Sequence, residues 1–267
     1  RHYDELDRYY RELWGEHLHH GLFARRDDDP QTAAERLVRM VAEQAMLQAG
    51  EDVCDVGCGY GATARQVADA YGVHVTGLTI SRSQVNHARE HTPPESGVRF
   101  LHEDWLHNRF PDSSFDAVLA IESLAHMSDK SRFFHEVMRT LRPGGRLVIC
   151  AWLTRDDPPW WARRFLLEPL CEEGALAGLG SASEYRSLMA EAGMASVTTN
   201  DLTRNVRQTW RVGTRRLAWA VLRRADYRQA LRDPGMASRT FALAVTRIRV
   251  AYGLGVTSRH SHPPSTG

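Results

Sequence analysis

DVGCGYGATA, residues 55–64, is the stretch that decides the fold of this 267-residue chain. It follows a short apolar run over 51–56, typical of a buried strand, and precedes a helical pattern over 62–71. Its three glycines, at 57, 59 and 61, fall in a strand-to-helix turn, where they allow positive backbone torsions and the close approach of a ligand. The pattern indicates a cofactor site, and a sharp turn without a ligand is the weaker alternative.

Strands and helices alternate along the chain around this turn. A helix is predicted over 29–48, with Asp29 as its cap and Pro30 at its first position. Further strands are expected at 73–78, 98–102, 115–121 and 146–152, with helices at 81–91 and 129–141 between them. This alternation predicts an α/β fold with a mostly parallel sheet, helices on both faces, and ligands outside the carboxyl ends of the strands.

The rest of the chain is mainly helical. Helical patterns cover 160–192 and 204–251, and strands are expected at 196–202 and 254–259. Ser81 with Gln84, and Ser181 with Glu184, have the spacing of a capping box. We therefore expect an N-terminal helical flap (1–28), a core that binds the cofactor (29–153), a helical lid and substrate-binding region with part of the core sheet (154–252), and a last edge strand with a disordered tail (253–267).

The composition is that of an ordinary globular chain, with 42% hydrophobic and 25% charged residues and a formal net charge of +1. No apolar run approaches the roughly 20 residues that span a bilayer, and no secretory signal precedes the first charged helix. A cytoplasmic location is therefore expected. The four cysteines lack the spacing of metal ligands, and the composition leaves a homo-oligomer open.

The C-terminal third is strongly basic, because 204–249 holds twelve arginines against two acids. On a continuous helix, the arginines at 204, 207, 211 and 215 fall within about 80° of one another, with Trp210 on the opposite face. Either this stripe is solvated and Trp210 faces the core or a substrate, or the helix breaks near Gly213. Such a bias also suits an anionic substrate, a nucleic acid or a membrane surface.

The glycine loop could serve two kinds of nucleotide site. A dinucleotide site requires an acid at the end of the second strand, and 77–81 has none. The pattern D-x-G-x-G-x-G, with Asp55 at the strand end, is instead similar to the first motif of class I S-adenosylmethionine-dependent methyltransferases. HEDW (102–105), PDSSFDAVLAIESLAHM (111–127) and LRPGGRLVI (141–149) follow in the order of that family. The resemblance implies its Rossmann-like sheet and S-adenosylmethionine as cofactor.

Three further stretches narrow the resemblance. WGEHLHHGLF (14–23), GLTISRSQ (77–84) and ESLAHMSDK (122–130) are similar to the branch of γ-tocopherol methyltransferases and bacterial isoprenoid C-methyltransferases, including those acting on geranyl diphosphate. This resemblance implies a small hydrophobic or isoprenoid substrate. It implies Mg²⁺ only if that substrate is a diphosphate, and no protein metal ligands are expected.

The resemblance also assigns the cofactor to particular residues. Backbone groups of Gly57, Cys58 and Gly59 would face its methionine part, and Asp55 would organise the loop or approach the ammonium group. The acceptor and the sulfonium would meet at the end of the fourth strand, beside Ile121.

The adenosine end is expected at the second and third strands. Thr79 and Ile80 would lie by the ribose, although the usual ribose-binding acid is absent, and Asp104 would accept from the adenine amino group. Trp105 would be an apolar wall or a core residue. The expected cofactor set is Asp55, Gly57, Cys58, Gly59, Thr79, Ile80, Gln84, Asp104, Trp105, Ile121, Glu122 and His20.

Methyl transfer is an in-line displacement, so most of the catalytic task is to hold donor and acceptor in near-attack geometry. An oxygen acceptor benefits from a base, whereas attack by an alkene carbon leaves a carbocation that aromatic rings stabilise and a base deprotonates. Glu122 and His126 could both face the cleft if their segment is helical, and His126 is alternatively a helix cap. With a lid carboxylate and two aromatic residues, the expected catalytic set is Glu122, His126, Glu168, Trp210 and Tyr10.

Three functions remain open. The first is methylation of a carbon in an isoprenoid or prenylated natural product, and the second is N- or O-methylation of a polyketide, alkaloid or other small metabolite. The third is a non-catalytic cofactor-binding partner. DPPW at 157–160 resembles the signature of amino-group methyltransferases on DNA, but it follows the fifth strand instead of the fourth. We interpret it as a turn that begins a lid helix, and expect no nucleic-acid partner.

Overall fold

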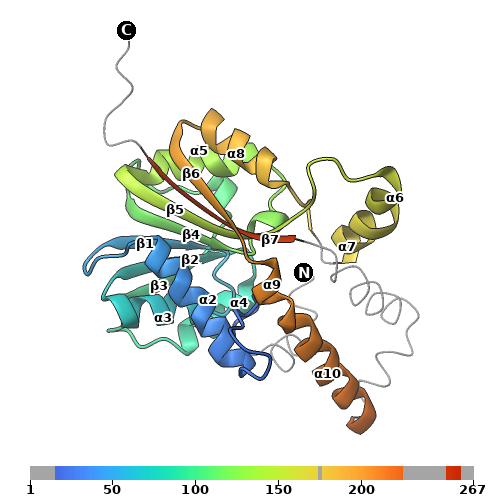
Figure 1. Cartoon of the computed structure of the whole chain (residues 1–267). Helices are drawn as coiled ribbons and strands as arrows, with labels where there is room; N and C mark the ends of the chain where they lie inside the picture. The colour runs from blue at the N-terminus through green and yellow to red at the C-terminus, as the bar shows by residue number, and fades with distance from the viewer. Residues whose placement is uncertain (1–15, 174–175, 225–250, 260–267) are drawn as a thin grey trace.

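The computed structural model describes residues 16–173, 176–224 and 251–259. Seven strands form one sheet in the order β3-β2-β1-β4-β5-β7-β6 (Figure 1). The strands are β1 (Asp52–Val56), β2 (His74–Thr79), β3 (Val98–His102), β4 (Phe115–Ile121), β5 (Leu141–Leu153), β6 (Met194–Asp201) and β7 (Ala251–Arg259). The strands β1 to β5 pair in parallel, and β7 is antiparallel to both of its neighbours. The predicted mostly parallel α/β sheet is therefore confirmed.

Helices cover both faces of this sheet (Figure 1). Apolar residues of α2 (Pro30–Gln44), α3 (Ala62–Tyr71) and α4 (Arg82–Glu90) pack in one core cluster. Those of α5 (Lys130–Thr140) and α8 (Ala182–Glu191) pack in a second cluster. Neighbouring residues of β1 divide between the clusters, because successive side chains of a strand point to opposite faces.

Side-chain caps fix where several helices begin. The Asp29 carboxylate accepts the amide hydrogen of Thr32 at 3.0 Å, so α2 begins at Pro30 as predicted. It ends at Gln44, earlier than predicted, because the next turn has Met46 at a φ of 48° and presents the Ala45 carbonyl to Arg146 at 2.8 Å. The capping box at α8 is complete.

The capping box expected at α4 is only half formed. Ser81 Oγ accepts the amide hydrogen of Gln84 at 3.3 Å. The Gln84 side chain does not return to the cap, because its Oε1 accepts from Thr79 Oγ1 at 2.6 Å. The result is a buried hydrogen bond at the carboxyl end of β2, beside the expected cofactor site.

The position of the last strand differs from the prediction. The expected edge strand is β7, but it lies between β5 and β6, so β6 is the edge of the sheet. Val256 pairs with Val148 on one side and with Thr198 on the other. Antiparallel pairing on both sides satisfies the backbone groups of β7, which an edge position would leave half paired. The expected tail, 260–267, lies outside the described residues.

The lid contains several short helices. α6 (Trp160–Ala162), a π-helical turn η3 (Arg163–Leu167) and α7 (Glu168–Glu173) follow β5, and α8 begins at Ala182. The DPPW stretch leads into α6 at Trp160, in agreement with the interpretation as a turn. After β6 come α9 (Thr203–Val206) and α10 (Gln208–Arg223). α10 is continuous through Gly213, and the arginines of the stripe are exposed, so the solvated alternative is confirmed.

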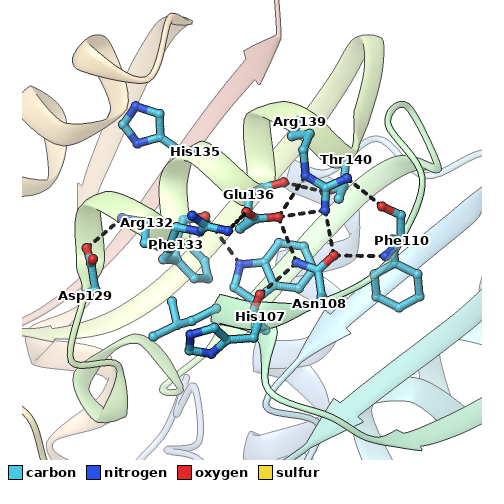
Figure 2. A network of polar contacts seen from close by, with 12 residues as sticks. His107, Asn108, Phe110, Asp129, Arg132, Phe133, His135, Glu136, Arg139 and Thr140 are labelled. Atoms are coloured by element: carbon cyan, nitrogen blue, oxygen red, sulfur yellow. Dashed lines mark hydrogen bonds and ion pairs between the residues drawn. The ribbon is translucent and has the colours of Figure 1, made fainter.

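A polar network joins the loop after β3 to α5 (Figure 2). Buried Glu136 accepts from Asn108 at 3.1 Å, from Arg139 at 2.7 Å and from Arg132 at 2.8 Å. Trp105, at the start of the 3₁₀ turn η1 (Trp105–His107), donates from its indole nitrogen to the Phe133 carbonyl at 3.3 Å. These bonds hold the loop that carries Asp104 and Trp105 toward the carboxyl ends of the strands.

Candidate active site

A cavity of about 320 Å³ lies at the carboxyl ends of β1, β2 and β4, where the fold predicts a ligand. Its walls come from the glycine loop, the flap before α2, the loops after β3 and β4, and α10. The structure brings the whole expected cofactor set to this cavity: Asp55, Gly57, Cys58, Gly59, Thr79, Ile80, Gln84, Asp104, Trp105, Ile121, Glu122 and His20.

The glycine loop takes the conformation that its sequence predicts. Gly57 has a φ of 82° and Gly59 a φ of 54°, both in the left-handed region. A Cβ on Gly57 would lie 2.4 Å from the Cβ of Ser123, so this glycine is required by the protein itself. The amide hydrogens of Gly57 and Cys58 both bond to the Leu78 carbonyl at 2.9 Å. The amide hydrogens of these two residues are therefore engaged with β2, although Gly57 is exposed, and Gly59, which is half-buried, also lines the cavity.

Asp55 is the least satisfied polar residue of the site. It is 3% exposed, and its Oδ2 has no hydrogen-bond partner among the described residues. Burial raises the pKa of this carboxyl to about 7. The buried hydroxyl of Ser123, also on the cavity wall, likewise lacks a partner there. Buried polar groups are rarely left unpaired, so this pair fits a ligand with a cationic group and a hydrogen-bond acceptor. The ammonium and carboxylate of S-adenosylmethionine meet both requirements.

At the opposite end of the cavity, the expected adenosine residues are mostly engaged with one another. Thr79 donates to Gln84 and accepts the amide hydrogen of Ser81 at 3.1 Å. Ile80 is 70% exposed and presents an apolar surface to the cavity. Trp105 is 2% exposed and belongs to the core cluster, and it also forms part of the cavity wall. Trp105 is therefore both a core residue and part of the apolar wall of the cavity.

Two acids lie together in the loop after β3. Asp104 caps η1 through the Leu106 amide at 3.0 Å and contacts His107 Nδ1 at 3.0 Å. Glu103 also lines the cavity, and its amide hydrogen bonds to the Thr79 carbonyl at 3.1 Å. Glu103 was not predicted as a site residue, although it stands in the HEDW motif. It supplies a carboxylate beside the end of β2, where the usual ribose-binding acid is absent.

Glu122 is the most constrained residue at the end of β4. It has a φ of 57°, and its amide hydrogen bonds to the Cys150 carbonyl at 2.8 Å. Its Oε1 accepts from the amide of His20 at 2.6 Å and lies 2.8 Å from His20 Nδ1, and its Oε2 accepts from Trp152 Nε1 at 2.9 Å. Burial favours the neutral acid, but adjacent His20 prevails and lowers the pKa of Glu122 to about 2. Glu122 is therefore a fixed carboxylate.

Glu122 and His126 both line the cavity, but their segment is not the single helix that the prediction assumed. Only Leu124–His126 make a helical turn, the 3₁₀ segment η2, and Glu122 lies outside it with a positive φ. The four-residue helical spacing that would align the two side chains is therefore absent. His126 still lines the cavity, in the same loop.

Three rings gather around Glu122. The ring centroids of His20 and Trp210 are 4.7 Å apart, those of His20 and Trp152 are 5.3 Å apart, and those of the two tryptophans are 5.9 Å apart. All three pairs have the edge-to-face geometry that aromatic rings prefer. Trp210 was predicted, and Trp152 was not. Its position at the end of the fifth strand was a signal that it would reach the cavity.

The flap is attached to the core by buried histidines. His19 Nδ1 donates to the His20 carbonyl at 2.9 Å, so its Nε2 accepts from His17 Nδ1 at 3.1 Å. Burial lowers the pKa of both rings, to about 3 for His17, and keeps them neutral. The Gly21 amide hydrogen bonds to Thr209 Oγ1 at 3.0 Å. The flap therefore joins the core to α10 and places His20 against Glu122.

Of the expected catalytic set, one member lies away from this cavity and one lies outside the described residues. Glu168, predicted as a lid carboxylate, does not line this cavity: it lies exposed on α7 and pairs with Arg164 at 2.9 Å. Lid helices on the surface leave such a residue in contact with solvent. Tyr10 lies outside the described residues, as do the further aromatic candidates Tyr9 and Trp14.

Apart from the histidines, the charged side chains among the described lining of the cavity are acidic. Its described lining includes five acids and no lysine or arginine. The acids are Glu16, Asp55, Glu103, Asp104 and Glu122. No group of three or more His, Cys, Asp or Glu in the described parts of the chain is arranged to hold a metal ion, so nothing supports Mg²⁺. In the same residues, no helix has the length and apolar character needed to cross a bilayer.

Comparison with known proteins identifies the class. Residues 54–149 match the family described as "Methyltransferase domain" (Methyltransf_11). The chain is 36% identical over 210 residues to the 27-O-demethylrifamycin SV methyltransferase of Amycolatopsis mediterranei (strain S699), and the match covers 74% of each chain. This chain belongs to the S-adenosylmethionine-dependent methyltransferases, and it is an enzyme of that class.

The proteins similar to this chain include members of the predicted branch. The chain is 29% identical over 235 residues to the chloroplastic tocopherol O-methyltransferase of Arabidopsis thaliana, which covers 78% of this chain and 66% of that protein. The [4+2]-cyclase SpnF superposes with a TM-score of 0.83 at 27% identity, over 98% of this chain and 95% of that chain. A geranyl diphosphate methyltransferase in complex with S-adenosylmethionine superposes with a TM-score of 0.71, over 91% of this chain and 98% of that chain. Its 19% identity shows the fold alone.

Proposed function

We propose that the chain transfers a methyl group to a hydroxyl of a small, uncharged and largely apolar natural product, of the polyketide or prenylated aromatic kind. The observation that carries this proposal is the Glu122–His20 pair at the end of β4, inside a cavity with an aromatic wall. The two relatives named above are O-methyltransferases of a rifamycin and of tocopherol, which supports the same acceptor class.

The cofactor supplies an electrophilic methyl group when it is bound. In this proposal, Asp55 holds its ammonium, Ser123 donates to its carboxylate, and the backbone at Gly59 lies against its methionine part. Glu103 takes the place of the missing ribose-binding acid, and Ile80 covers the adenine with Trp105. The unpaired Asp55 and Ser123 atoms are the observation that favours this orientation.

His20 is the residue proposed to accept the proton of the acceptor. Since Glu122 is ionised, His20 Nδ1 must be the protonated nitrogen that donates to it at 2.8 Å. A neutral His20 then carries its lone pair on Nε2, the nitrogen that could accept a proton from a hydroxyl in the cavity. Glu122 itself is a poor base for a hydroxyl, and its charge stabilises the imidazolium that results. His126 remains a second candidate base on the same wall.

Methylation of an isoprenoid carbon is the second candidate, and the three-ring cluster favours it. The faces of Trp152 and Trp210 can stabilise a carbocation, and His20 can then remove its proton. A prenylated small molecule suits this version better than geranyl diphosphate. The described lining offers five carboxylates and no lysine or arginine to a diphosphate, and burial of uncompensated anions is costly.

The test is incubation of the purified chain with methyl-labelled S-adenosylmethionine and a panel of acceptors. The panel contains a prenylated hydroquinone, a hydroxylated polyketide macrocycle, an amine-bearing alkaloid and geranyl diphosphate. Mass spectrometry detects the product, and NMR locates the methyl group on oxygen, nitrogen or carbon. A methoxy product from the uncharged acceptors supports the main proposal, and a C-methyl product supports the second candidate. Methylation of geranyl diphosphate alone would contradict both versions of the acceptor class.

A non-catalytic role is tested in the same experiment. One structural neighbour is described as a cyclase, so binding of the cofactor does not establish methyl transfer. If S-adenosylhomocysteine binds but no acceptor gains a labelled methyl group, the proposal of methyl transfer to these acceptors fails. The His20→Ala variant is the matched control, because it should bind the cofactor and lose turnover.

A further inference from the structure

The outer face of α9 and α10 is a basic surface that the proposed function does not use. Residues 203–224 contain no acid. Six arginines of this segment are exposed, namely Arg204, Arg207, Arg211, Arg215, Arg216 and Arg223. The segment therefore presents a concentrated positive charge on a chain whose formal net charge is only +1.

The same face also carries large apolar side chains. Leu222 is 78% exposed and Trp219 is 55% exposed. At 100° per residue, Leu222 falls between Arg211 and Arg215 on α10, and Trp219 lies about 40° beyond Arg215. The buried Thr209 and Ala220 are on the opposite side, facing the protein. The exposed face thus mixes arginine with tryptophan and leucine.

Trp219 makes a cation–π contact with an arginine of the same helix. The guanidinium carbon of Arg223 lies 4.7 Å from the centroid of the Trp219 ring. An indole ring that stacks against a cation, on a helix that carries other arginines, is well suited to the boundary between water and lipid head groups. A solvated face needs charge, but it gains nothing from an exposed tryptophan and an exposed leucine.

The helix that carries this surface also contributes to the cavity wall. Trp210 of α10 and Leu176, which follows α7, both line the cavity. The lid before α7 exposes further aromatic residues, with Trp160 74% and Phe165 62% exposed. Figure 1 shows α6, α7 and α10 projecting from the same side of the sheet. An apolar molecule that reaches this side from a membrane would arrive beside the cavity.

We propose that the exposed face of α9 and α10 docks on an anionic lipid surface. The arginines attract acidic head groups, and Trp219 and Leu222 enter the interface between head groups and acyl chains. The apolar side chains favour lipid over nucleic acid, because they can enter the acyl region of a membrane but make no ionic contact with a phosphate backbone. The inference concerns binding and is independent of which acceptor is methylated.

The test is co-sedimentation of the full chain with two kinds of vesicle. One kind contains phosphatidylcholine alone, and the other replaces about a third of it with phosphatidylglycerol. We expect binding to the anionic vesicles only, and weaker binding as salt screens the charges. The double variant Arg211→Gln/Arg215→Gln should bind about tenfold or more weakly, since each arginine near an acidic surface contributes to binding. Trp219→Ser/Leu222→Ser should also bind less tightly, but it should keep its dependence on salt, because its arginines are unchanged.

The matched control is Arg39→Gln/Arg109→Gln, which removes the same charge from exposed arginines on α2 and in the loop after η1. It should bind the anionic vesicles like the unaltered chain, and all variants should bind S-adenosylhomocysteine with unchanged affinity. Equal loss of vesicle binding in both charge variants would overturn the proposal, because it would show a net-charge effect. So would the absence of vesicle binding, or a dependence on Arg211 and Arg215 seen with RNA or polyglutamate and not with vesicles. None of these outcomes depends on turnover.

Discussion

Two glutamates, half-buried Glu122 at the cavity and buried Glu136 in the network of Figure 2, differ in the chemistry of their partners. Glu136 is 5% exposed and accepts from two arginines and an asparagine. Glu122 accepts from a backbone amide, a histidine and a tryptophan. Arginine stays charged at any ordinary pH, whereas histidine can exchange a proton.

The surroundings of the two residues differ in the same way. Around Glu136, Asn108 and Arg139 are joined to each other and to Glu136 by hydrogen bonds and an ion pair (Figure 2). Around Glu122, Asp55 Oδ2 and Ser123 Oγ have no partner in the described residues, and Glu122 itself has a φ of 57°. The satisfied site contributes stability, and the strained, unsatisfied site is the one suited to bind and react.

The largest effect should come from neutralising each glutamate in turn. Glu122→Gln should lower turnover by about a hundredfold to a thousandfold, because the carboxylate that fixes the His20 tautomer is lost. Glu136→Gln should leave turnover within a few-fold and lower the free energy of unfolding by about 2 kcal/mol, because a buried partner of Arg139 is lost. The measurements are steady-state kinetics and chemical denaturation.

The pH dependence of turnover separates a role through His20 from simple loss of structure. Glu122→Gln should shift the acidic limb of the pH profile, and Glu136→Gln should not move it. If both variants lose stability and keep the profile of the unaltered chain, Glu122 is a structural residue like Glu136 and the proposed base is wrong.

Gly57→Ala should have the next largest effect. The added Cβ would lie 2.4 Å from Ser123 Cβ, at a φ of 82° that alanine rarely adopts. We expect a loss of about 3 kcal/mol in the free energy of unfolding, from strain and overpacking together. S-adenosylhomocysteine affinity, measured by calorimetry, should fall by a hundredfold or more as the loop shifts.

A second variant distinguishes the clash from the backbone strain. Gly57→Ala/Ser123→Gly removes the atom that the new Cβ meets, so it should recover part of the lost stability. Cofactor affinity should stay low, since the Ser123 hydroxyl is also gone. A double variant no more stable than Gly57→Ala would assign the whole cost to the backbone torsion.

The elements that the sequence predicted well are those specified by local patterns. The strands at 98–102 and 115–121 coincide with β3 and β4, and Asp29 and Pro30 begin α2 as expected. The glycine loop has its predicted torsions because glycine is the residue that tolerates them at low cost. The cofactor residues follow from these elements, since parallel strands bring their carboxyl ends to one edge.

The features that were missed depend on contacts between distant segments. Glu122 and His20 are 102 positions apart, and no local spacing indicates that they meet. The insertion of β7 between β5 and β6 depends on pairing across the whole sheet, because its own sequence suits an edge or an interior position. The helix considered for Glu122 and His126 is only a 3₁₀ turn over Leu124–His126, because Glu122 has a positive φ that ends the helical pattern.

Asp55 provides the next test of the cavity, where polar atoms lack hydrogen-bond partners among the described residues. Its carboxyl has a pKa raised by burial to about 7, so the folded chain retains a proton that the unfolded chain has already released. Stability should therefore fall between about pH 4 and pH 7, by up to about 4 kcal/mol, and stay low above that range. Asp55→Asn should remove this fall and be the more stable chain near pH 8. It should also lose about tenfold in S-adenosylhomocysteine affinity, because the ammonium loses a charged partner.

Stability against pH and S-adenosylhomocysteine affinity, measured on Glu136→Gln, give the comparison with Asp55→Asn. That variant should bind S-adenosylhomocysteine normally at every pH. If Asp55→Asn instead shows the pH dependence of the unaltered chain, Asp55 is not the residue that titrates. Undiminished cofactor affinity would remove Asp55 from the ammonium site.

The smallest effect is expected at the flap, where His17 is kept neutral. Burial lowers its pKa to about 3, so below its ordinary value of 6.5 the unfolded chain takes up a proton that the folded chain refuses. Stability of the flap should fall as the pH drops through this range, by about 1 kcal/mol near pH 5.5. His17→Gln keeps a donor for His19 and should abolish that fall, measured by hydrogen exchange at the Gly21 amide.

His135→Gln, which changes an exposed histidine on α5, is the control and should leave the acid sensitivity unchanged. Equal acid sensitivity in His17→Gln would show that the flap opens for another reason, and the contrast between the cavity and the network would then rest on Glu122 and Asp55 alone.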